Sequence, residues 1–373
     1  MMLRRIPSCC DIERNAREVL AGTLRSQEHD STALVLDYWI QRCGNSGISD
    51  VVSVLLAIER GDFSDSSYSA DLVDHLADLR RRRAAGDLPV HRGGCYWIFG
   101  YGEEPVGDDL DEQIYAWSGR LRERRPPDPL AQDLVEFMGP DPESLFPKLQ
   151  QGAHTGTMLA HNFAAEVASA KELSETHYGV ILGAWMPIGP LAVLGSHPEL
   201  GLRYGVKMRR WNFAALGAFR FGSSAEPYEA QRSSGAVGTE RTSQFFGYHF
   251  GGEVGRDLVP PKANELQVLS GIGYDAFTAL KENEEDDLGA AVAISLDLNV
   301  GLEYRHYVNE RWYVGLQSKY HWVDFTLSDA VEMTGQPFTL SLLFGMVSNV
   351  SKQYRYDMLQ LDNERIRPKR VPQ

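Results

Sequence analysis

The C-terminal half of the chain alternates apolar and polar residues, most clearly between Ile294 and Arg305. Every even-numbered residue from Ile294 to Tyr304 is apolar, whereas the odd-numbered residues from Ser295 to Arg305 are small, polar or charged. A period of two places all the apolar side chains on one face of a β-strand. A strand of about a dozen residues is also long enough to cross a bilayer. The pattern therefore predicts a long strand with one apolar face and one polar face.

The same alternation recurs from about Thr176 onward and predicts eight strands of roughly nine to fifteen residues each. The predicted strands are Tyr178–Met186, Leu200–Met208, Phe213–Phe221, Phe245–Val254, Leu266–Ala276, Val292–His306, Trp312–Trp322 and Phe338–Met346. An even number of sequential strands of this length is typical of a closed, up-and-down antiparallel barrel of the outer-membrane type.

The connections between these strands differ in length in a regular way. The long ones are Pro187–Pro198, Gly222–Arg241, Leu280–Ala290 and Thr326–Pro337, and they alternate with Arg209–Asn212, Tyr307–Arg311 and a moderate Arg256–Asn264. Outer-membrane barrels have long outer loops and short periplasmic turns, and an even strand count places both ends of the chain on the periplasmic side. The alternation therefore supports the barrel prediction independently of the strand pattern.

The first part of the chain has a helical period instead. Between about Asp11 and Leu173, apolar residues recur at intervals of three and four, and we expect short amphipathic helices. Two starts are marked by Asp128-Pro129 and Asp141-Pro142, because Asp caps exposed N–H groups and Pro fits the first turn. We expect Gly93–Gly107 to be an ordered loop and the basic run Arg80–Arg83 to end a helix.

The alternation alone does not say which face of the barrel points inward, because a lipocalin-type soluble barrel keeps its apolar face inside. The polar face combines glycines with charges of both signs, which suits a narrow interior, and aromatic residues lie near the strand ends of the apolar face. We therefore expect the polar face to line a closed lumen in which opposite charges pair. The predicted lumen charges are Arg203, Lys207, Arg220, Glu253, Asp275, Asp297, Glu303, Arg305 and Lys319.

Composition restricts the function classes. The formal net charge is −14, which argues against a nucleic-acid binder because phosphate binding needs clustered Lys and Arg. The segment Met1–Pro7 contains no apolar core of a secretory signal, although an outer-membrane barrel must be exported. We expect the printed chain to begin downstream of its signal, or the signal to have been removed.

The candidate chemistry in the chain is limited. The cysteines are Cys9, Cys10, Cys43 and Cys95, and their spacing is not that of a metal site. The sequence allows two alternatives: a disulfide from Cys9 or Cys10 to Cys43, or buried free thiols. His249 and His321 fall on the lumen face, where we expect a hydrogen-bond network rather than catalysis, and His306 continues the outward face. The run Glu282–Asp287 is expected to be a solvated acidic loop rather than a cation site. We expect no metal and no cofactor.

The barrel half, roughly Thr176 to Tyr354, resembles small eight-stranded bacterial outer-membrane β-barrel proteins and is similar to uncharacterised barrels common in Bacteroidetes-type bacteria. The segments that carry the resemblance are Trp185–Gly189, His197–Gly201, Asn264–Gln267, Gly271–Asp275, Gly301–Arg305 and Leu316–Tyr320. The resemblance implies a bacterial outer-membrane location with a periplasmic N-terminal extension, and it supplies no catalytic residues. Many such barrels end at a terminal aromatic residue, whereas this chain continues to Gln373.

These observations predict an α+β protein. An α-helical domain, residues 1–173, is followed by an eight-stranded antiparallel transmembrane β-barrel, residues 174–354, and a basic C-terminal tail, residues 355–373. We expect a non-enzymatic structural, scaffold or interaction protein in the outer membrane, with outer-membrane lipid around the barrel and a periplasmic protein partner for the helical domain. Nucleic acid is not an expected partner. The alternatives are a lipid-modifying barrel enzyme and a soluble lipocalin-like ligand-binding barrel.

Overall fold

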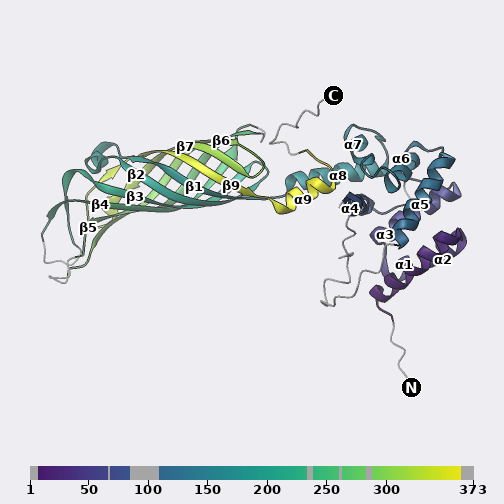
Figure 1. The fold of residues 1–373 in the computed structure, drawn as a ribbon. Helices are drawn as coiled ribbons and strands as arrows, with labels where there is room; N and C mark the ends of the chain where they lie inside the picture. The colour runs from purple at the N-terminus through teal and green to yellow at the C-terminus, as the bar shows by residue number, and fades with distance from the viewer. Residues whose placement is uncertain are drawn as a thin grey trace, which may run out of the picture. The chain divides into compact units, whose positions relative to one another are not determined.

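The computed structural model describes residues 7–65, 68–84, 109–232, 238–259, 263–282 and 288–362. These residues form two compact units: a helical unit that extends to Ala170 and also includes Tyr354–Leu361, and a barrel unit, Lys171–Gln353 (Figure 1). No helix among the described residues combines the length and the apolar character that crossing a membrane requires. The predicted fold class, helices followed by a closed eight-stranded antiparallel barrel, is confirmed.

The helical unit is built from short amphipathic helices around one apolar core. Their bounds are α1 Cys9–Ser26, α2 His29–Cys43, α3 Gly47–Arg60, α4 Leu72–Ala84, α5 Asp109–Arg124, α6 Pro129–Met138, α7 Leu145–Gln150, α8 Met158–Glu172 and α9 Val350–Met358. The core includes Leu20, Leu55, Trp117 and Phe146, all fully buried. Burial of their apolar surface is the main stabilising term for such a unit in water.

Helix starts follow the capping residues in most cases. The side chain of Asp128 accepts a hydrogen bond from the Ala131 amide at 2.9 Å, and Pro129 occupies the first turn of α6, as predicted. The predicted start at Asp141 is wrong by about a turn. Asp141 accepts a bond from the amide of Glu143, only two residues on, so it closes a local turn, and α7 begins at Leu145.

The segment after the barrel is not simply a basic tail. Residues 350–358 form α9, and Met358 and Leu359 lie in the apolar core of the helical unit. Arg355 pairs with Asp74 at 2.9 Å and also with Glu166. The expectation of a tail from residue 355 therefore failed to recognise an amphipathic helix, while residues 363–373 lie outside the described part of the chain.

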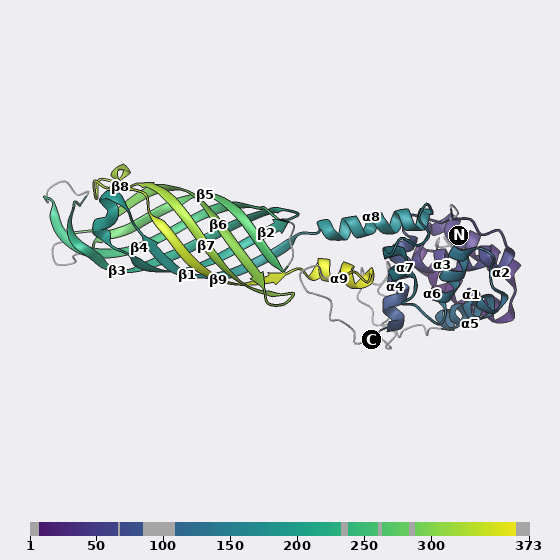
Figure 2. The ribbon, with the colours of Figure 1, turned by 90° about the horizontal axis from the view of Figure 1, so that it is seen from above.

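The barrel has eight long strands. They are β1 Glu175–Met186, β2 His197–Met208, β3 Trp211–Ala230, β4 Glu240–Asp257, β5 Asn264–Leu280, β6 Ala291–Tyr307, β7 Trp312–Asp324 and β9 Phe338–Ser348, and a two-residue strand, β8 Thr334–Gly335, pairs with β7. Each strand pairs antiparallel with its sequence neighbour, β7 with β9, and β9 with β1, which closes the barrel. Figure 2 shows the strands inclined to the barrel axis, as closure requires.

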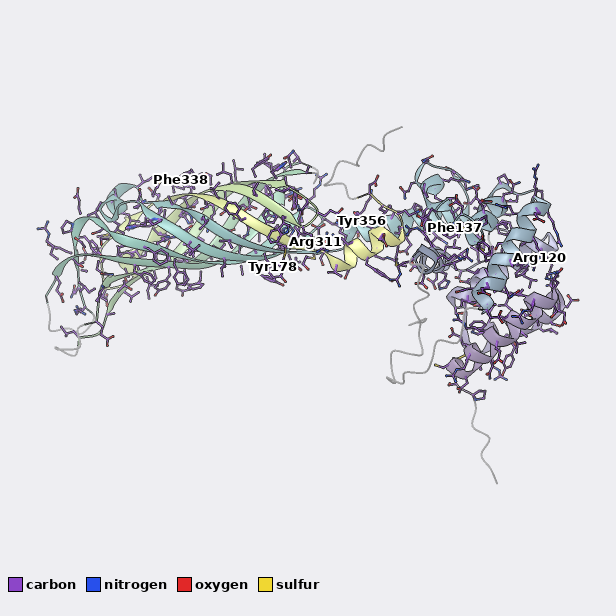
Figure 3. All side chains as sticks on the ribbon, in the orientation of Figure 1. Arg120, Phe137, Tyr178, Arg311, Phe338 and Tyr356 are labelled. Atoms are coloured by element: carbon purple, nitrogen blue, oxygen red, sulfur yellow. A yellow bond between two sulfur atoms is a disulfide. The ribbon has the colours of Figure 1, made fainter. Side chains whose placement is uncertain are left out.

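The apolar face of every predicted strand points outward. Leu202 and Leu298, for example, are 68% and 48% exposed, whereas their polar strand neighbours Arg203, Asp297 and Asn299 are buried. Tyr178 is another outward residue, visible among the side chains that project from the barrel in Figure 3. The exterior is therefore apolar and the interior polar, which is the reverse of a lipocalin-type barrel.

The two barrel ends differ. The short connections 209–210 and 308–311 lie at the end where β1 begins and β9 ends, because Glu175 pairs with Lys207 and Thr176 with Ser348. At the other end the connection after β1 forms a short 3-10 helix, Gly189–Leu194, which packs in an apolar cluster. That cluster fills the interior at this end and consists of Trp185, Leu191, Leu194, Tyr228, Ala230, Phe245, Phe277, Ala279, Leu280, Ala291, Ala293, Val323, Phe325, Ala330 and Val331.

Candidate functional site: the charged lumen

All nine predicted lumen charges lie inside the barrel. Their exposed fractions are between 0 and 6%, and they come from six strands, β2 to β7. Burying an isolated charge costs roughly several kcal/mol, so these nine charges must be paired or solvated inside the barrel. The structure brings them together in three layers along the barrel.

The middle layer is centred on Glu303 of β6. Arg203, from the diametrically opposed strand β2, donates a hydrogen bond to one carboxylate oxygen, and Arg305 donates to the other. Gln317 donates to Glu303 at 2.7 Å, and the Arg305 guanidinium lies 5.0 Å from the ring centre of Tyr313. One carboxylate thus binds two guanidinium groups, one from its own strand and one from across the barrel.

The same layer is completed by a second carboxylate, Glu253 of β4. Its side chain accepts a hydrogen bond from Lys319 of β7 at 2.6 Å and lies 3.6 Å from Arg203. These pairs join strands that are two and three positions apart around the barrel. Because the barrel is narrow, their side chains occupy the lumen rather than lining an open channel.

The layer nearest the short turns is built around Lys207. Its ammonium lies 2.8 Å from both Asp257 and Glu265. Tyr307 donates to Glu265 at 3.1 Å. Two carboxylates therefore share one lysine at this level.

The layer nearest the long loops contains Arg220 of β3. It donates to both carboxylate oxygens of Asp275 at 2.7 Å and to Glu199 at 2.9 Å. Its guanidinium lies 4.8 Å from the ring centre of Trp185, so the charged lumen meets the aromatic cluster here.

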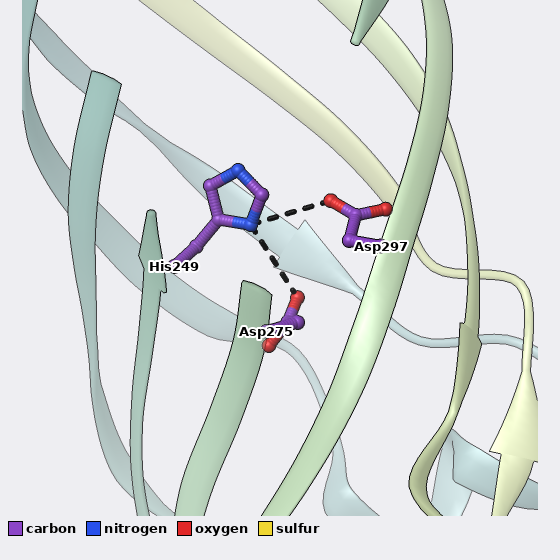
Figure 4. A group of neighbouring side chains, drawn as sticks. All are labelled: His249, Asp275 and Asp297. Carbon is purple, nitrogen blue, oxygen red and sulfur yellow. Dashed lines mark ion pairs between the residues drawn. The ribbon is translucent and has the colours of Figure 1, made fainter. Parts of the chain in front are cut away.

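Two histidines adjoin this layer. His321 contacts Asp297 at 2.8 Å through Nδ1 and Thr339 at 3.1 Å through Nε2, as the predicted hydrogen-bond network requires. His249 lies 3.2 Å from Asp297 and 4.0 Å from Asp275 through Nδ1 (Figure 4). His249, Asp275 and Asp297 come from three adjacent strands, β4, β5 and β6.

Glu199, Asp257 and Glu265 are among the lumen carboxylates that the sequence prediction missed. Each is on the polar face of its strand, but each lies just beyond the predicted strand ends at Leu200, Val254 and Leu266. Extending each strand by one to three residues at the same parity would have found all three.

Glycines on the lumen face make room for this network. A Cβ atom at Gly271 would lie 2.6 Å from Oδ1 of Asn299 and 2.9 Å from Cγ of Glu253. Such distances are too short for real side chains, so glycine is required where the carboxylate arm of Glu253 crosses the neighbouring strand.

The remaining candidates are separate from the lumen. His306 is exposed on the outside, where it contacts Asn264 at 2.7 Å. Arg80–Arg83 form the end of α4, as expected, and Arg80 pairs with Glu143 at 2.9 Å.

Cys9 and Cys43 form a disulfide, and Cys10 is disulfide-bonded as well. Most of the acidic run Glu282–Asp287, together with Gly93–Gly107 and Cys95, lies outside the described residues.

Comparison with solved structures finds similar barrels. Neisserial surface protein A is 10% identical, with a TM-score of 0.32, over 47% of this chain and 95% of its own. The N-terminal β-barrel domain of Pseudomonas aeruginosa OprF is 10% identical, with a TM-score of 0.29, over 46% and 99%. Ail, the attachment invasion locus protein of Yersinia pestis, is 13% identical, with a TM-score of 0.27, over 47% and 97%.

No protein-family model and no curated protein sequence matches the chain. The similarity to Bacteroidetes-type barrels therefore stays an expectation from the sequence. At 10–13% identity and TM-scores near 0.3, the structural likenesses carry no argument about activity.

Proposed function

We propose that this protein is an integral outer-membrane β-barrel with a periplasmic helical unit, and that it acts as a non-enzymatic scaffold or interaction protein. The observation that carries the proposal is the inverted polarity of the barrel. Outward residues such as Leu202, Ile272 and Phe344 are about half to two-thirds exposed, while Asp297 and Glu303 are fully buried. An apolar exterior that surrounds the whole barrel is unfavourable in water and favourable in lipid.

The barrel topology supports a periplasmic helical unit. The strands β1 and β9 connect to α8 and α9, respectively, at the barrel end with the short turns. Short turns face the periplasm in outer-membrane barrels. The two connections tether the helical unit to the barrel at both ends of its strand sequence, which suits a scaffold that holds a partner near the membrane.

The cysteines support the same compartment. The Cys9–Cys43 disulfide joins the start of α1 to the end of α2. Disulfides persist in oxidising compartments such as the bacterial periplasm and are rare in the cytosol. A helical unit with such a crosslink is therefore expected outside the cytosol.

The distribution of histidines supports a non-enzymatic role. A lipid-modifying barrel enzyme would need a His within hydrogen-bond reach of a Ser or Asp on its lipid-facing rim. Among the described barrel residues, the exposed histidine is His306, which contacts the amide side chain of Asn264. His306 also lies at the short-turn end, on the side of the barrel away from the outer leaflet.

The test is to express the chain with a cleavable signal, fractionate the cells and compare gel mobility with and without boiling. We expect outer-membrane enrichment and a heat-modifiable band. A soluble protein whose mobility and stability are indifferent to detergent would contradict the membrane assignment.

Orientation is tested by cysteine labelling of intact cells with a membrane-impermeant maleimide. We expect Leu327→Cys, in the long connection after β7, to be labelled from outside, and Glu310→Cys, in a short turn, to be labelled only after the outer membrane is permeabilised. The unsubstituted protein is the control for its own cysteines. The opposite labelling pattern would invert the proposed topology.

A further inference from the structure

The cluster of His249, Asp275 and Asp297 has the composition and spacing of a metal site. One ligand atom from each residue, an imidazole nitrogen or a carboxylate oxygen, lies within 4.8 Å of the other two. Bond lengths of about 2.0–2.2 Å place neighbouring ligand atoms of a tetrahedral ion roughly 3.4 Å apart. The separations of 3.2 and 4.0 Å from Nδ1 of His249 to the two carboxylates are close to that value. All three residues are buried inside the barrel wall.

Their positions are fixed by strand pairing rather than by flexible loops. His249 and Asp275 are direct Cα partners in the β4–β5 ladder. Asp297 pairs with Gly273, so it lies two residues further along the β5–β6 ladder on the same face. Sites built on paired strands hold their ligands more precisely than sites on loops.

His249 is the observation that points to a ligand. The side chain is 2% exposed, and neither ring nitrogen has a hydrogen-bond partner among the described residues. Nδ1 lies near Asp297 but outside hydrogen-bond geometry, and Oδ1 of Asp297 is also without a partner. Buried polar groups almost always form hydrogen bonds, so an imidazole that makes none and is aimed at two carboxylates calls for an occupant.

The ring of His249 has little freedom to turn away. A Cβ atom at Gly251 would lie 3.1 Å from its Nε2, and one at Gly273 would lie 3.0 Å from its Cε1. The imidazole therefore occupies space that only glycines at these two positions leave open.

The local charge also favours a divalent cation. Glu199, Asp275 and Asp297 contribute three negative charges, and Arg220, which pairs with the first two, contributes one positive charge. With neutral histidines these four groups carry an excess of two negative charges, part of which Lys319 in the neighbouring layer offsets. A bound divalent ion would remove that excess, whose burial is otherwise costly.

The neighbouring residues orient the carboxylates as outer-shell groups do in metal sites. His321 contacts Oδ2 of Asp297 at 2.8 Å and is itself held by Thr339. Arg220 holds both oxygens of Asp275 at 2.7 Å. Hydrogen bonds of this kind fix ligating carboxylates and raise metal affinity.

We propose that the barrel lumen binds one borderline divalent transition metal, with zinc as the best fit, through His249, Asp275 and Asp297. Mixed imidazole and carboxylate donors suit zinc and its neighbours, whereas calcium and magnesium prefer oxygen donors alone. The ion would join three adjacent strands through their side chains.

The test uses the full, tag-free chain refolded in detergent and shown to be folded by its heat-modifiable band. After incubation with Zn²⁺ and removal of unbound metal, we expect about one equivalent of zinc in the unsubstituted protein, the stoichiometry of a single structural site. Co²⁺ gives a second readout, because its visible absorption bands report coordination by protein ligands.

The matched variants are His249→Gln and His306→Gln, which each remove one histidine. We expect His249→Gln to lose zinc affinity at least about 100-fold and to lose the Co²⁺ bands, while His306→Gln, on the exposed exterior, keeps both. A folded unsubstituted protein that retains no zinc, or a His249→Gln variant that binds zinc as tightly as His306→Gln, would overturn the proposal. If His249→Gln fails to fold, Asp297→Asn serves as the second variant with the same expected loss.

Discussion

The two units of this protein place the same kinds of residues in opposite locations. In the helical unit, Leu55 and Trp117 are buried, as in any water-soluble domain. In the barrel, Leu202 is 68% exposed while Glu303 is fully buried. Both arrangements arise from amphipathic elements, with periods near 3.6 and 2 residues, respectively.

The difference shows that the amphipathic pattern specifies two faces and the surroundings determine which face is covered. The helical unit is stabilised by its own apolar core. The barrel depends less on such a core, because its strands are joined by a closed backbone ladder and ion pairs occupy much of its lumen. Beside these ion pairs lies a smaller apolar cluster of Ile181, Leu216, Tyr307, Tyr313, Leu343 and Val347. The barrel exterior is therefore expected to obtain its apolar partner from lipid.

The largest effect is expected from disrupting the middle lumen layer. Glu303→Gln leaves Arg203 and Arg305 without their shared charge partner, and breaking a buried pair costs about 3–5 kcal/mol. We expect a large decrease in the urea concentration at which the heat-modifiable form unfolds in lipid vesicles. The control is Glu310→Gln in an exposed turn, expected to change stability by less than about 0.5 kcal/mol. Equal midpoints for the two variants would mean that the ion-pair layer does not stabilise the barrel.

A matched pair of leucines tests the surroundings directly. Leu202 on the barrel and Leu34 on α2 are 68% and 71% exposed, so geometry alone gives them equal accessibility. In lipid vesicles we expect Leu202→Lys to destabilise the barrel by about 2–4 kcal/mol, the cost of a lysine near the bilayer midplane. Leu34→Lys should change the stability of the helical unit by less than about 0.5 kcal/mol, because its surroundings are water. If neither substitution changes stability, the barrel exterior is not surrounded by lipid.

The strand pattern predicted the barrel well because every strand repeats the same alternation over its membrane-length part. It failed at the outer ends of β3 and β4. The predicted end of β3 was Phe221, but the strand continues to Ala230, and the predicted start of β4 was Phe245, but the strand begins at Glu240. There the outward residues, such as Glu229, are polar and exposed, so the apolar alternation stops although the strand continues. Pairing in β-strands does not require an apolar face.

The candidate site was predicted only in part for a different reason. Parity along one strand identifies a lumen residue, and all nine predicted charges are buried. The proximity of His249 to Asp297 depends on two successive registers, β4 with β5 and β5 with β6. A register shift by one residue would place either side chain on the other face, and no local pattern specifies that register. The missed amphipathic helix α9 has a similar cause, since its apolar residues are too few to stand out before their core is known.

The smallest expected effect concerns acid, and it belongs to the helical unit alone. Burial raises the pKa of Asp133, but hydrogen bonds from Lys148 and His154 lower it by more, and the net pKa is below the usual value. A carboxyl with a lowered pKa in the folded state binds fewer protons than in the unfolded chain, so its stabilising contribution is complete above the unfolded pKa of about 3.9. It is lost as the pH falls from there through the folded pKa.

The Lys148 side chain is partly exposed, so water screens its interaction with Asp133. We therefore expect Asp133→Asn to lower the free energy of unfolding by at most about 1 kcal/mol at neutral pH. The cost should shrink toward pH 3, where the carboxyl of the unsubstituted protein is also becoming protonated. Urea unfolding of the helical unit, followed at pH 7, 5 and 3 for both proteins, measures the difference. A cost that grows on acidification would reverse the sign of the linkage and mean that Asp133 is protonated more readily in the folded unit than in the unfolded chain.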